Sequence, residues 1–172
     1  AQYNEATVYG LFLDEAARAK PAADRMVMFL KEVLRRDKTP ADLRNRALRQ
    51  YISTRFFRFR KPEEFVEEAQ QMLIKSNYAG WQSELLFRLA QAQEHFLKVP
   101  VDANKSYFEY LSFYPAGRRV EEIRRRIPQV YVKADDKKNA LRFFEKLIED
   151  NQLSDEIRVD ASMQMARLLI GE

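Results

Sequence analysis

Apolar residues recur at steps of three and four along almost the whole chain, and this period predicts amphipathic helices. In one example, a single helical face carries Trp81, Leu85, Leu89, Ala92 and Phe96. The periods predict nine helices, near residues 3–19, 21–37, 40–59, 62–76, 80–97, 102–114, 118–133, 136–150 and 154–170. The connections between them are short, so consecutive helices should be antiparallel neighbours in an all-α fold.

Prolines mark several of the predicted helix starts. Pro21, Pro40 and Pro62 each precede a charged, amphipathic run, as expected of proline in the first turn of a helix. Pro128 is different because it lies inside the run 118–133, where proline removes a backbone hydrogen bond and clashes with the preceding turn. We expect a kink there, or two short helices.

A pattern of one small and two bulky residues returns late in the sequence at a nearly fixed interval. Its members are Ala103, Tyr107 and Tyr110 and, 37 residues later, Ala140, Phe144 and Leu147. A second series, with members 38 residues apart, contains Gln93, Tyr131 and Leu169. Self-similarity at such periods indicates stacked helical repeats, each too small to bury its own apolar face.

This pattern resembles the tetratricopeptide family in a degenerate form. In that family, paired antiparallel helices stack into a right-handed superhelix, with small residues where two helices approach closely and larger ones in the adjoining holes. Ala103, Tyr107 and Tyr110 match the second-helix motif, and Pro115 stands near the family's terminal proline. The family's usual period is about 34 residues, so the longer interval implies extra residues in helices or turns.

The resemblance extends to one subgroup and to the organisation of the chain. The segment Phe-Glu-Tyr-Leu-Ser-Phe-Tyr-Pro at 108–115 is similar to endings in bacterial envelope tetratricopeptide proteins, among them the β-barrel assembly lipoprotein D type. The family implies one helical-repeat domain over residues 1–172, built as a short α-solenoid of antiparallel helix pairs. The repeats are irregular in 1–78 and clearer in 79–170.

Residue types needed for several kinds of chemistry are missing. The chain has no cysteine, which excludes disulfides, thiolate nucleophiles and cysteine-based metal sites. His95 is the single histidine, and no motif places a serine or an acid as its catalytic partner, so we interpret it as a helix-surface or groove residue. The four glycines are isolated and form no phosphate-binding loop. We therefore predict a non-catalytic protein without metal or cofactor.

Basic and aromatic residues alternate between Tyr51 and Lys61, where Arg55, Arg58 and Arg60 stand among phenylalanines. Such alternation can hold phosphates while the rings stack on bases, which makes the stretch a candidate nucleic-acid site. It is equally typical of a core aromatic cluster whose arginines extend to water or lie over the rings. We favour the second interpretation because no known nucleic-acid module accompanies the stretch.

A second basic cluster occupies residues 118–126. Glu121 and Glu122 stand four residues before Arg125 and Arg126, so each glutamate should neutralise one of these arginines on the helix surface. Arg118, Arg119 and Arg124 stay available for an acidic partner. Together with the three arginines of the first stretch, they are the candidate binding residues.

Two functions agree with these features. Helical arrays usually act as binding surfaces, so we interpret the chain as a scaffold or adaptor that binds another protein, or further repeats of its parent chain, in a bacterial envelope assembly. The alternative is a basic helical-repeat module that binds RNA or DNA through residues 51–61. The surface is mixed, with 30 basic and 26 acidic residues, and tolerates anionic partners without demanding them. A steep salt dependence of nucleic-acid affinity would distinguish the two.

The compartment is indicated only by indirect features. No apolar run approaches the ~18 residues needed to cross a bilayer. The opening Ala1-Gln2 suits a mature start after signal-peptide cleavage and equally a trimmed chain. With the envelope resemblance, a periplasmic or otherwise exported location is favoured over a cytoplasmic one.

The last predicted helix, residues 154–170, is apolar on a wide arc. Ile157 and Ala161 share one side, and Ala166 and Leu169 widen it, so the helix should be buried on more than one face. It fits the first-helix position of a repeat, and no second helix follows to cover it. We expect residues beyond it in a longer parent protein, a second copy of the chain, or a different partner to bury the remaining face.

Overall fold

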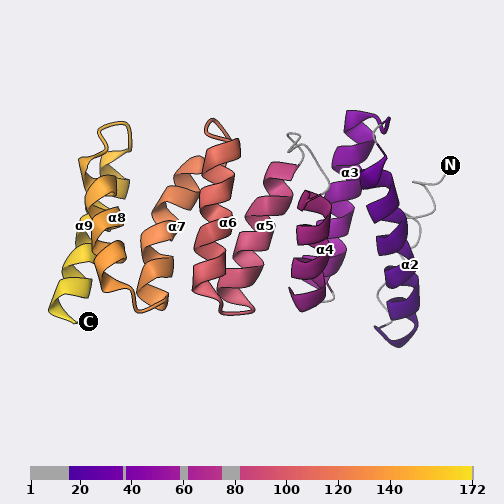
Figure 1. Cartoon of the computed structure of the whole chain (residues 1–172), viewed down its shortest axis with the longest axis horizontal. Coiled ribbons are helices and arrows are strands. Elements are labelled where there is room, and N and C mark those ends of the chain that lie inside the picture. Colours follow the sequence, from indigo (N-terminus) through magenta and orange to yellow (C-terminus); the bar gives the residue numbers. More distant parts are fainter. Residues whose placement is uncertain (1–15, 37, 59–61, 75–81, 172) are drawn as a thin grey trace. The chain divides into compact units, whose positions relative to one another are not determined.

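Every regular element that the structure describes is a helix. The computed structural model describes residues 16–36, 38–58, 62–74 and 82–171. No strand occurs in these ranges, which confirms the predicted all-α fold. The elements are α2 (Ala16–Arg35), α3 (Ala41–Ile52), the π-helical segment η1 (Ser53–Arg58), α4 (Pro62–Ile74), α5 (Gln82–His95), α6 (Pro100–Phe113), α7 (Val120–Lys133), α8 (Lys137–Glu149) and α9 (Asp155–Ile170), as drawn in Figure 1.

The chain divides into two compact units, residues 1–88 and 89–172, and α5 runs from one into the other. In the first unit, α2 packs against α3, and η1 contacts α2, α3 and α4. Tyr51 stacks on Phe65 with ring centroids 5.8 Å apart, and Phe56 meets Phe65 edge-on at 5.4 Å. These three rings are buried. They form an aromatic core in this unit.

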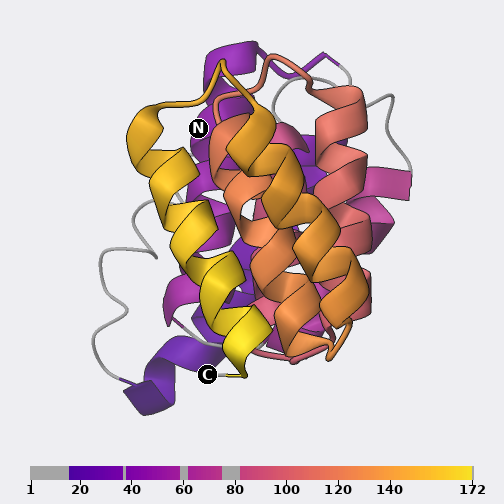
Figure 2. The same ribbon diagram turned by 90° about the vertical axis from the view of Figure 1, so that its left-hand side faces the viewer.

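In the second unit, each helix packs against the next one along the chain, α6 on α7, α7 on α8 and α8 on α9. Consecutive helices run antiparallel (Figure 1), and Figure 2 shows α8 and α9 side by side. The α8–α9 contact is built on buried Ala140, Phe144, Leu147 and Ala161. Partly buried apolar residues that pack against this cluster are Tyr131, Ile148, Leu153, Met165 and Leu168.

The prolines act partly as predicted. The helices α3 and α4 begin at or directly after Pro40 and Pro62. The predicted break at Pro21 is wrong, because α2 is continuous from Ala16 to Arg35. Burial of its apolar side, with Val27 and Leu30 fully inaccessible, favours one helix and offsets the missing hydrogen bond. Most of the predicted helix 3–19 lies outside the described residues.

Pro128 lies within α7, which is a single helix and not two short ones. The ring is buried, together with Ile123, Ile127 and Val130 of the same helix. Proline has no N–H, so the interior backbone of α7 lacks one hydrogen bond here. The packing of this apolar side against α6 and α8 holds the helix continuous across the proline.

Matching positions of the 37-residue pattern have matching burial. Ala103 of α6 and Ala140 of α8 are both completely buried, and so are the bulky residues that follow them, Tyr107 and Phe144. A residue as small as alanine in a fully enclosed position lets neighbouring helices approach closely. This is the role that the sequence pattern predicts for both alanines.

The turns before α6 and α8 are also alike. Lys98 and Asp135, which are 37 residues apart, adopt left-handed backbone conformations with φ of 55° and 57°. The next residue in each turn, Val99 or Asp136, donates its N–H back into the preceding helix at 2.9 Å. Positive φ is uncommon for residues other than glycine. The two turns therefore share a left-handed residue at the spacing of the sequence pattern, although the returning hydrogen bond spans six residues in the first turn and five in the second.

Enlarging either buried alanine should destabilise the fold. Ala103→Leu or Ala140→Leu adds atoms to a closed helix contact, and overpacking of this kind lowers the free energy of unfolding by about 1–3 kcal/mol. Chemical denaturation followed by circular dichroism measures the change. Lys105→Leu is the control, because Lys105 lies on α6 but is exposed. Equal stability of all three variants would contradict the close packing inferred for Ala103 and Ala140.

Candidate functional site

A buried carboxylate organises the start of the second unit. The side chain of Glu94, at the end of α5, is only 1% exposed. It accepts hydrogen bonds from the Tyr107 hydroxyl at 2.8 Å and from the Lys133 ammonium at 2.5 Å. The Arg126 guanidinium approaches the same carboxylate at 3.4 Å. Glu94 therefore ties α5 to α6 and α7.

The electrostatics of this cluster fix the protonation states of its members. Burial opposes ionisation of Glu94, but hydrogen bonds from Lys133 and Tyr107 outweigh it and hold the pKa of Glu94 below its usual value. Burial, with the nearby charge of Glu94, raises the pKa of Tyr107. At neutral pH the carboxylate is ionised and the phenol protonated. This is the arrangement of a structural cluster, because neither group titrates near neutrality, where proton transfer is most effective.

His95 lies at the edge of the cluster, with 41% of its side chain exposed. Its Nε2 is 2.9 Å from a guanidinium nitrogen of Arg126. Burial lowers the pKa of His95, as do Lys133 and Arg126, against the opposing effect of Glu94. A neutral ring therefore accepts the Arg126 hydrogen bond through Nε2. Among the described residues, no group of histidines and carboxylates is arranged to hold a metal ion.

The first unit contains a similar cluster around Glu68 of α4. Its carboxylate accepts hydrogen bonds from Tyr51 at 3.1 Å, Lys31 at 3.1 Å and Arg55 at 3.2 Å. Arg55 also donates to Asp24 at 2.7 Å. Burial opposes ionisation of Glu68, and the hydrogen bonds from Arg55 and Lys31 reverse that effect, so its pKa lies below the usual value.

Of the candidate arginines in the first stretch, only Arg55 has a side chain that the structure describes. The side chain of Arg55 is only 8% exposed, and carboxylates of Asp24, Glu64 and Glu68 surround its guanidinium. The side chain of Arg58 and all of Arg60 lie outside the part of the chain that the structure describes. Arg55 is therefore a buried residue held by carboxylates, and it neither extends to water nor is exposed on the surface.

Two of the three candidate arginines in the second cluster, Arg119 and Arg124, form ion pairs with different carboxylates. Arg119 pairs with Glu122 at 2.9 Å, and Arg126 pairs with the same carboxylate at 3.4 Å, as the spacing of four predicts for the latter. Arg124 reaches across to Asp150 at the end of α8, at 3.0 Å. Arg118 is exposed. Much of the positive charge of this cluster is therefore paired with carboxylates of the same unit.

Arg124 and Asp150 lie at a hollow of about 270 Å³ between α6, α7 and α8. The rings of Phe108 and Phe143 lie 5.5 Å apart among its lining residues. The Lys146 ammonium sits 4.8 Å from the centroid of Phe143, in a cation–π contact. The cations of this hollow are therefore engaged by neighbours in the same unit.

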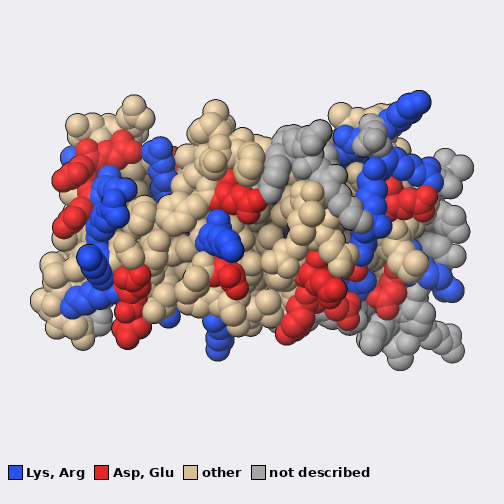
Figure 3. All heavy atoms as spheres, viewed as in Figure 1, with Lys and Arg blue, Asp and Glu red and all other residues tan. Residues whose placement is uncertain are grey.

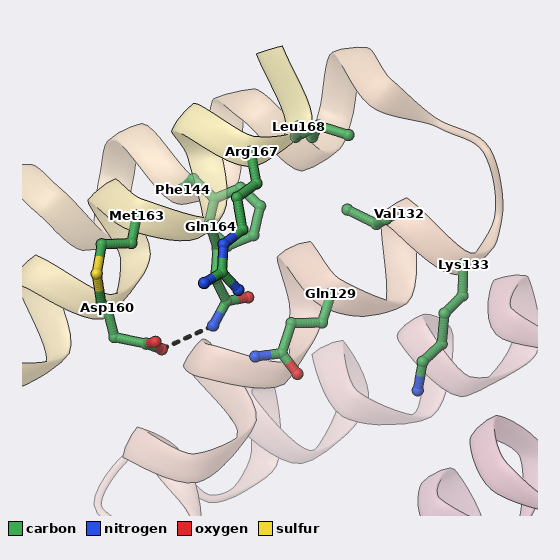
Figure 4. Close-up of a pocket in the computed structure, with 9 residues that line it drawn as sticks. All are labelled: Gln129, Val132, Lys133, Phe144, Asp160, Met163, Gln164, Arg167 and Leu168. Carbon is green, nitrogen blue, oxygen red and sulfur yellow. Dashed lines mark hydrogen bonds between the residues drawn. The ribbon is translucent and has the colours of Figure 1, made fainter. Parts of the chain in front are cut away.

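A larger groove, of about 420 Å³, runs between α7 and α9 (Figure 4). Phe144 of α8 lies at its base, and Val132 of α7 and Met163 of α9 are apolar residues at its sides. Val132 is 41% exposed and Met163 is 50% exposed. The remaining lining residues are Gln129, Lys133, Asp160, Gln164, Arg167 and Leu168.

The polar groups of the groove carry both charges. Asp160 accepts a hydrogen bond from Gln164 at 2.7 Å, one turn further along α9. Arg167 contributes a guanidinium on the α9 side, whereas the ammonium of Lys133, another lining residue, points away from the groove and is bound to Glu94 (Figure 4). The groove is thus apolar at its base and charged at its rim. This combination is typical of surfaces that bind protein segments.

The sequence did not identify this groove. Val132 and Met163 are separated by 31 positions and come together only because α7 and α9 both pack on α8. The available signal is weak: each is an apolar residue on the side of its helix opposite the main apolar stripe. A single exposed apolar residue is common on protein surfaces and carries no prediction by itself.

The surface elsewhere is mixed in charge. On the face shown in Figure 3, acidic and basic side chains are interspersed. No helix in the described part of the chain is both long and apolar enough to cross a membrane. No protein-family model, curated protein or solved structure matches the chain.

Replacing Glu94 by glutamine should destabilise the second unit. Gln has nearly the same shape but cannot carry the charge that binds Lys133 and Arg126. Loss of these charge-assisted hydrogen bonds should lower the free energy of unfolding by about 2 kcal/mol at neutral pH. Denaturant titration measures it, with Glu145→Gln on the exposed side of α8 as control.

The same pair of proteins tests the pH dependence. A carboxyl group whose folded-state pKa is depressed stabilises the protein above its unfolded pKa, and this stabilisation is lost as pH falls through the folded value. The difference between wild type and Glu94→Gln should therefore shrink as the solution is made acidic. A difference that stays constant down to acid pH would contradict the lowered pKa of Glu94.

Proposed function

We propose that this chain is a non-catalytic helical-repeat scaffold that binds a segment of another protein in the groove between α7 and α9. The observation that carries this proposal is the half-exposed apolar lining of the groove, Val132 and Met163 above Phe144. Apolar side chains left open in a concave surface gain free energy when a partner covers them. A segment of about two helical turns fits the scale of such a groove.

The proposed array is of the tetratricopeptide-like kind. It is supported by the burial of Ala103 and Ala140 and by the matching left-handed turns at Lys98 and Asp135. In such an array, alternate helices line one face, and α7 and α9 are alternate helices. The groove then belongs to the face formed by the first helices of successive repeats. Resemblance to envelope repeat proteins is the reason to place the scaffold in an exported, envelope assembly.

Binding of RNA or DNA is the less supported alternative. The guanidinium of Arg55 is surrounded by carboxylates, so a phosphate would have to replace a buried ion pair to reach it. Arg119 and Arg124 each pair with an acidic neighbour. A steep fall of nucleic-acid affinity with salt would favour this alternative over the protein-binding scaffold.

A charge placed in the groove should abolish partner binding. In Val132→Glu, a carboxylate replaces an apolar group at the groove wall, so covering it by a partner would bury a charge. Val101→Glu is the matched control, because Val101 is 73% exposed on α6 and does not line the groove. Affinity capture from an extract of the source cells should retain a partner with wild type and Val101→Glu. Val132→Glu should retain at least tenfold less.

The outcomes of this experiment are distinct. Equal capture by all three proteins would contradict a partner site in the groove. It would show that the partner binds another surface of the scaffold. Capture of nucleic acid rather than protein would support the alternative. Circular dichroism of Val132→Glu checks that the helices are intact, which is expected because the substituted side chain is half-exposed.

A further inference from the structure

The outer side of α9 carries a regular apolar row. Val159, Met163, Ala166 and Ile170 follow one another at spacings of four, three and four, and all are exposed. Val159 is 56% exposed and Ile170 is 70% exposed. At 100° per residue, this row lies on the side of α9 opposite Ile157, which is buried toward α8. The helix is therefore apolar on two opposite sides, only one of which is covered within the unit.

A spacing of four, three and four is the a/d repeat of a coiled-coil seam. In that frame, Met163 and Ile170 occupy a positions, and Val159 and Ala166 occupy d positions. The row extends over about 16 Å of helix axis, at 1.5 Å per residue. It is short for a free-standing coiled coil, but α8 already holds α9 in the helical state. Because packing on α8 already keeps α9 helical, a second helix can bind without the free-energy cost of forming α9.

The charges beside the row favour one orientation of a second copy. Asp160 and Arg167 are seven residues apart and occupy successive e positions. In an antiparallel pair, e positions flank e positions of the other helix, so Asp160 of each copy faces Arg167 of the other. In a parallel pair, g positions flank e positions, and Asp155 would face Asp160. The antiparallel pair thus forms two opposite-charge contacts, whereas the parallel pair brings like charges together.

We propose that α9 is a self-association helix, through which two copies of this chain pair antiparallel about a two-fold axis, with the row Val159, Met163, Ala166 and Ile170 as the seam. The surface is self-complementary because reversal of the helix exchanges its acidic and basic e positions. Antiparallel helices also align their macrodipoles favourably. An interface with the same patch on both subunits is the usual form of a homodimer.

The seam and the groove are adjacent but separable. Met163 belongs to both, and Asp160 and Arg167, which flank the seam, also line the groove, whereas Val132 lies on α7 and is not part of the row. Because the seam is short, the dimer should be weak and concentration-dependent. Self-association through α9 goes beyond the proposed scaffold function. Val132→Glu should leave the dimer intact, and a failure to capture a partner protein would not count against the dimer.

Charge reversal tests the orientation directly. Sedimentation velocity of the full chain should show a monomer–dimer equilibrium. Asp160→Arg alone, or Arg167→Asp alone, converts both cross-helix pairs into like-charge contacts and should weaken the dimer at least tenfold. The double variant restores both pairs in reversed order and should restore dimerisation. Glu145→Arg, on the exposed side of α8, makes the same change in charge outside the seam and should have no effect.

Disulfide trapping gives a second measurement of the register. The chain has no cysteine, so any disulfide that forms must join the cysteines introduced by substitution. Antiparallel pairing sets position 163 against position 166 of the other copy, so a mixture of Met163→Cys and Ala166→Cys proteins should form mainly mixed disulfides under mild oxidation. Parallel pairing would form mainly disulfides between identical variants.

Three results would overturn the proposal. The first is a monomer at every concentration up to the millimolar range. The second is a double charge variant as weak as either single variant. The third is a predominance of disulfides between identical cysteine variants. Circular dichroism checks that each variant keeps its helices, which is expected because none of the substituted side chains is buried.

Discussion

The second unit depends on an ionised carboxylate in an almost fully buried position. Moving a charge out of water is expensive unless it is paired and hydrogen-bonded. Glu94 meets this condition only when α5, α6 and α7 are correctly placed, because the hydroxyl of Tyr107 and the ammonium of Lys133 come from different helices. A displaced helix would leave the charge uncompensated. The cluster therefore selects one packing arrangement more than it adds stability, since a well-packed apolar core of the same volume can be as stable.

The first unit uses the same solution around Glu68, with Tyr51 and Arg55 in comparable roles. The chain carries 30 basic and 26 acidic residues, a formal charge of +4. Some of its arginine and lysine charge is used to neutralise buried or half-buried carboxylates. A basic composition by itself therefore does not establish a basic binding site, and Arg55 is the clearest case, because its guanidinium lies inside the unit and not on its surface.

The sequence predicted the helices well where local signals dominate. Period and capping residues placed α6, α8 and α9 within about two residues of their observed bounds, because an amphipathic stripe is a local property. It failed at Pro21, where packing of the following turns overrides a local helix-breaking signal. The burial of Arg55 and the groove at Val132 could not be predicted, since both depend on contacts between residues far apart in the chain. Hydrophobic periodicity identifies which side of a helix is buried, but not which helices meet.

The outer row of α9 links the two proposals energetically. Met163 belongs to the proposed seam and borders the groove, and Asp160 and Arg167 flank the seam and also line the groove, so a partner segment and a second copy of the chain share part of one surface. Binding at one site must then change affinity at the other by the same factor in both directions. A partner that competes for Met163 would shift the chain toward monomer, whereas one that contacts both copies would stabilise the dimer. The sign of this coupling is set by how far the partner extends past Arg167, because only a segment that reaches beyond the groove can touch the second α9.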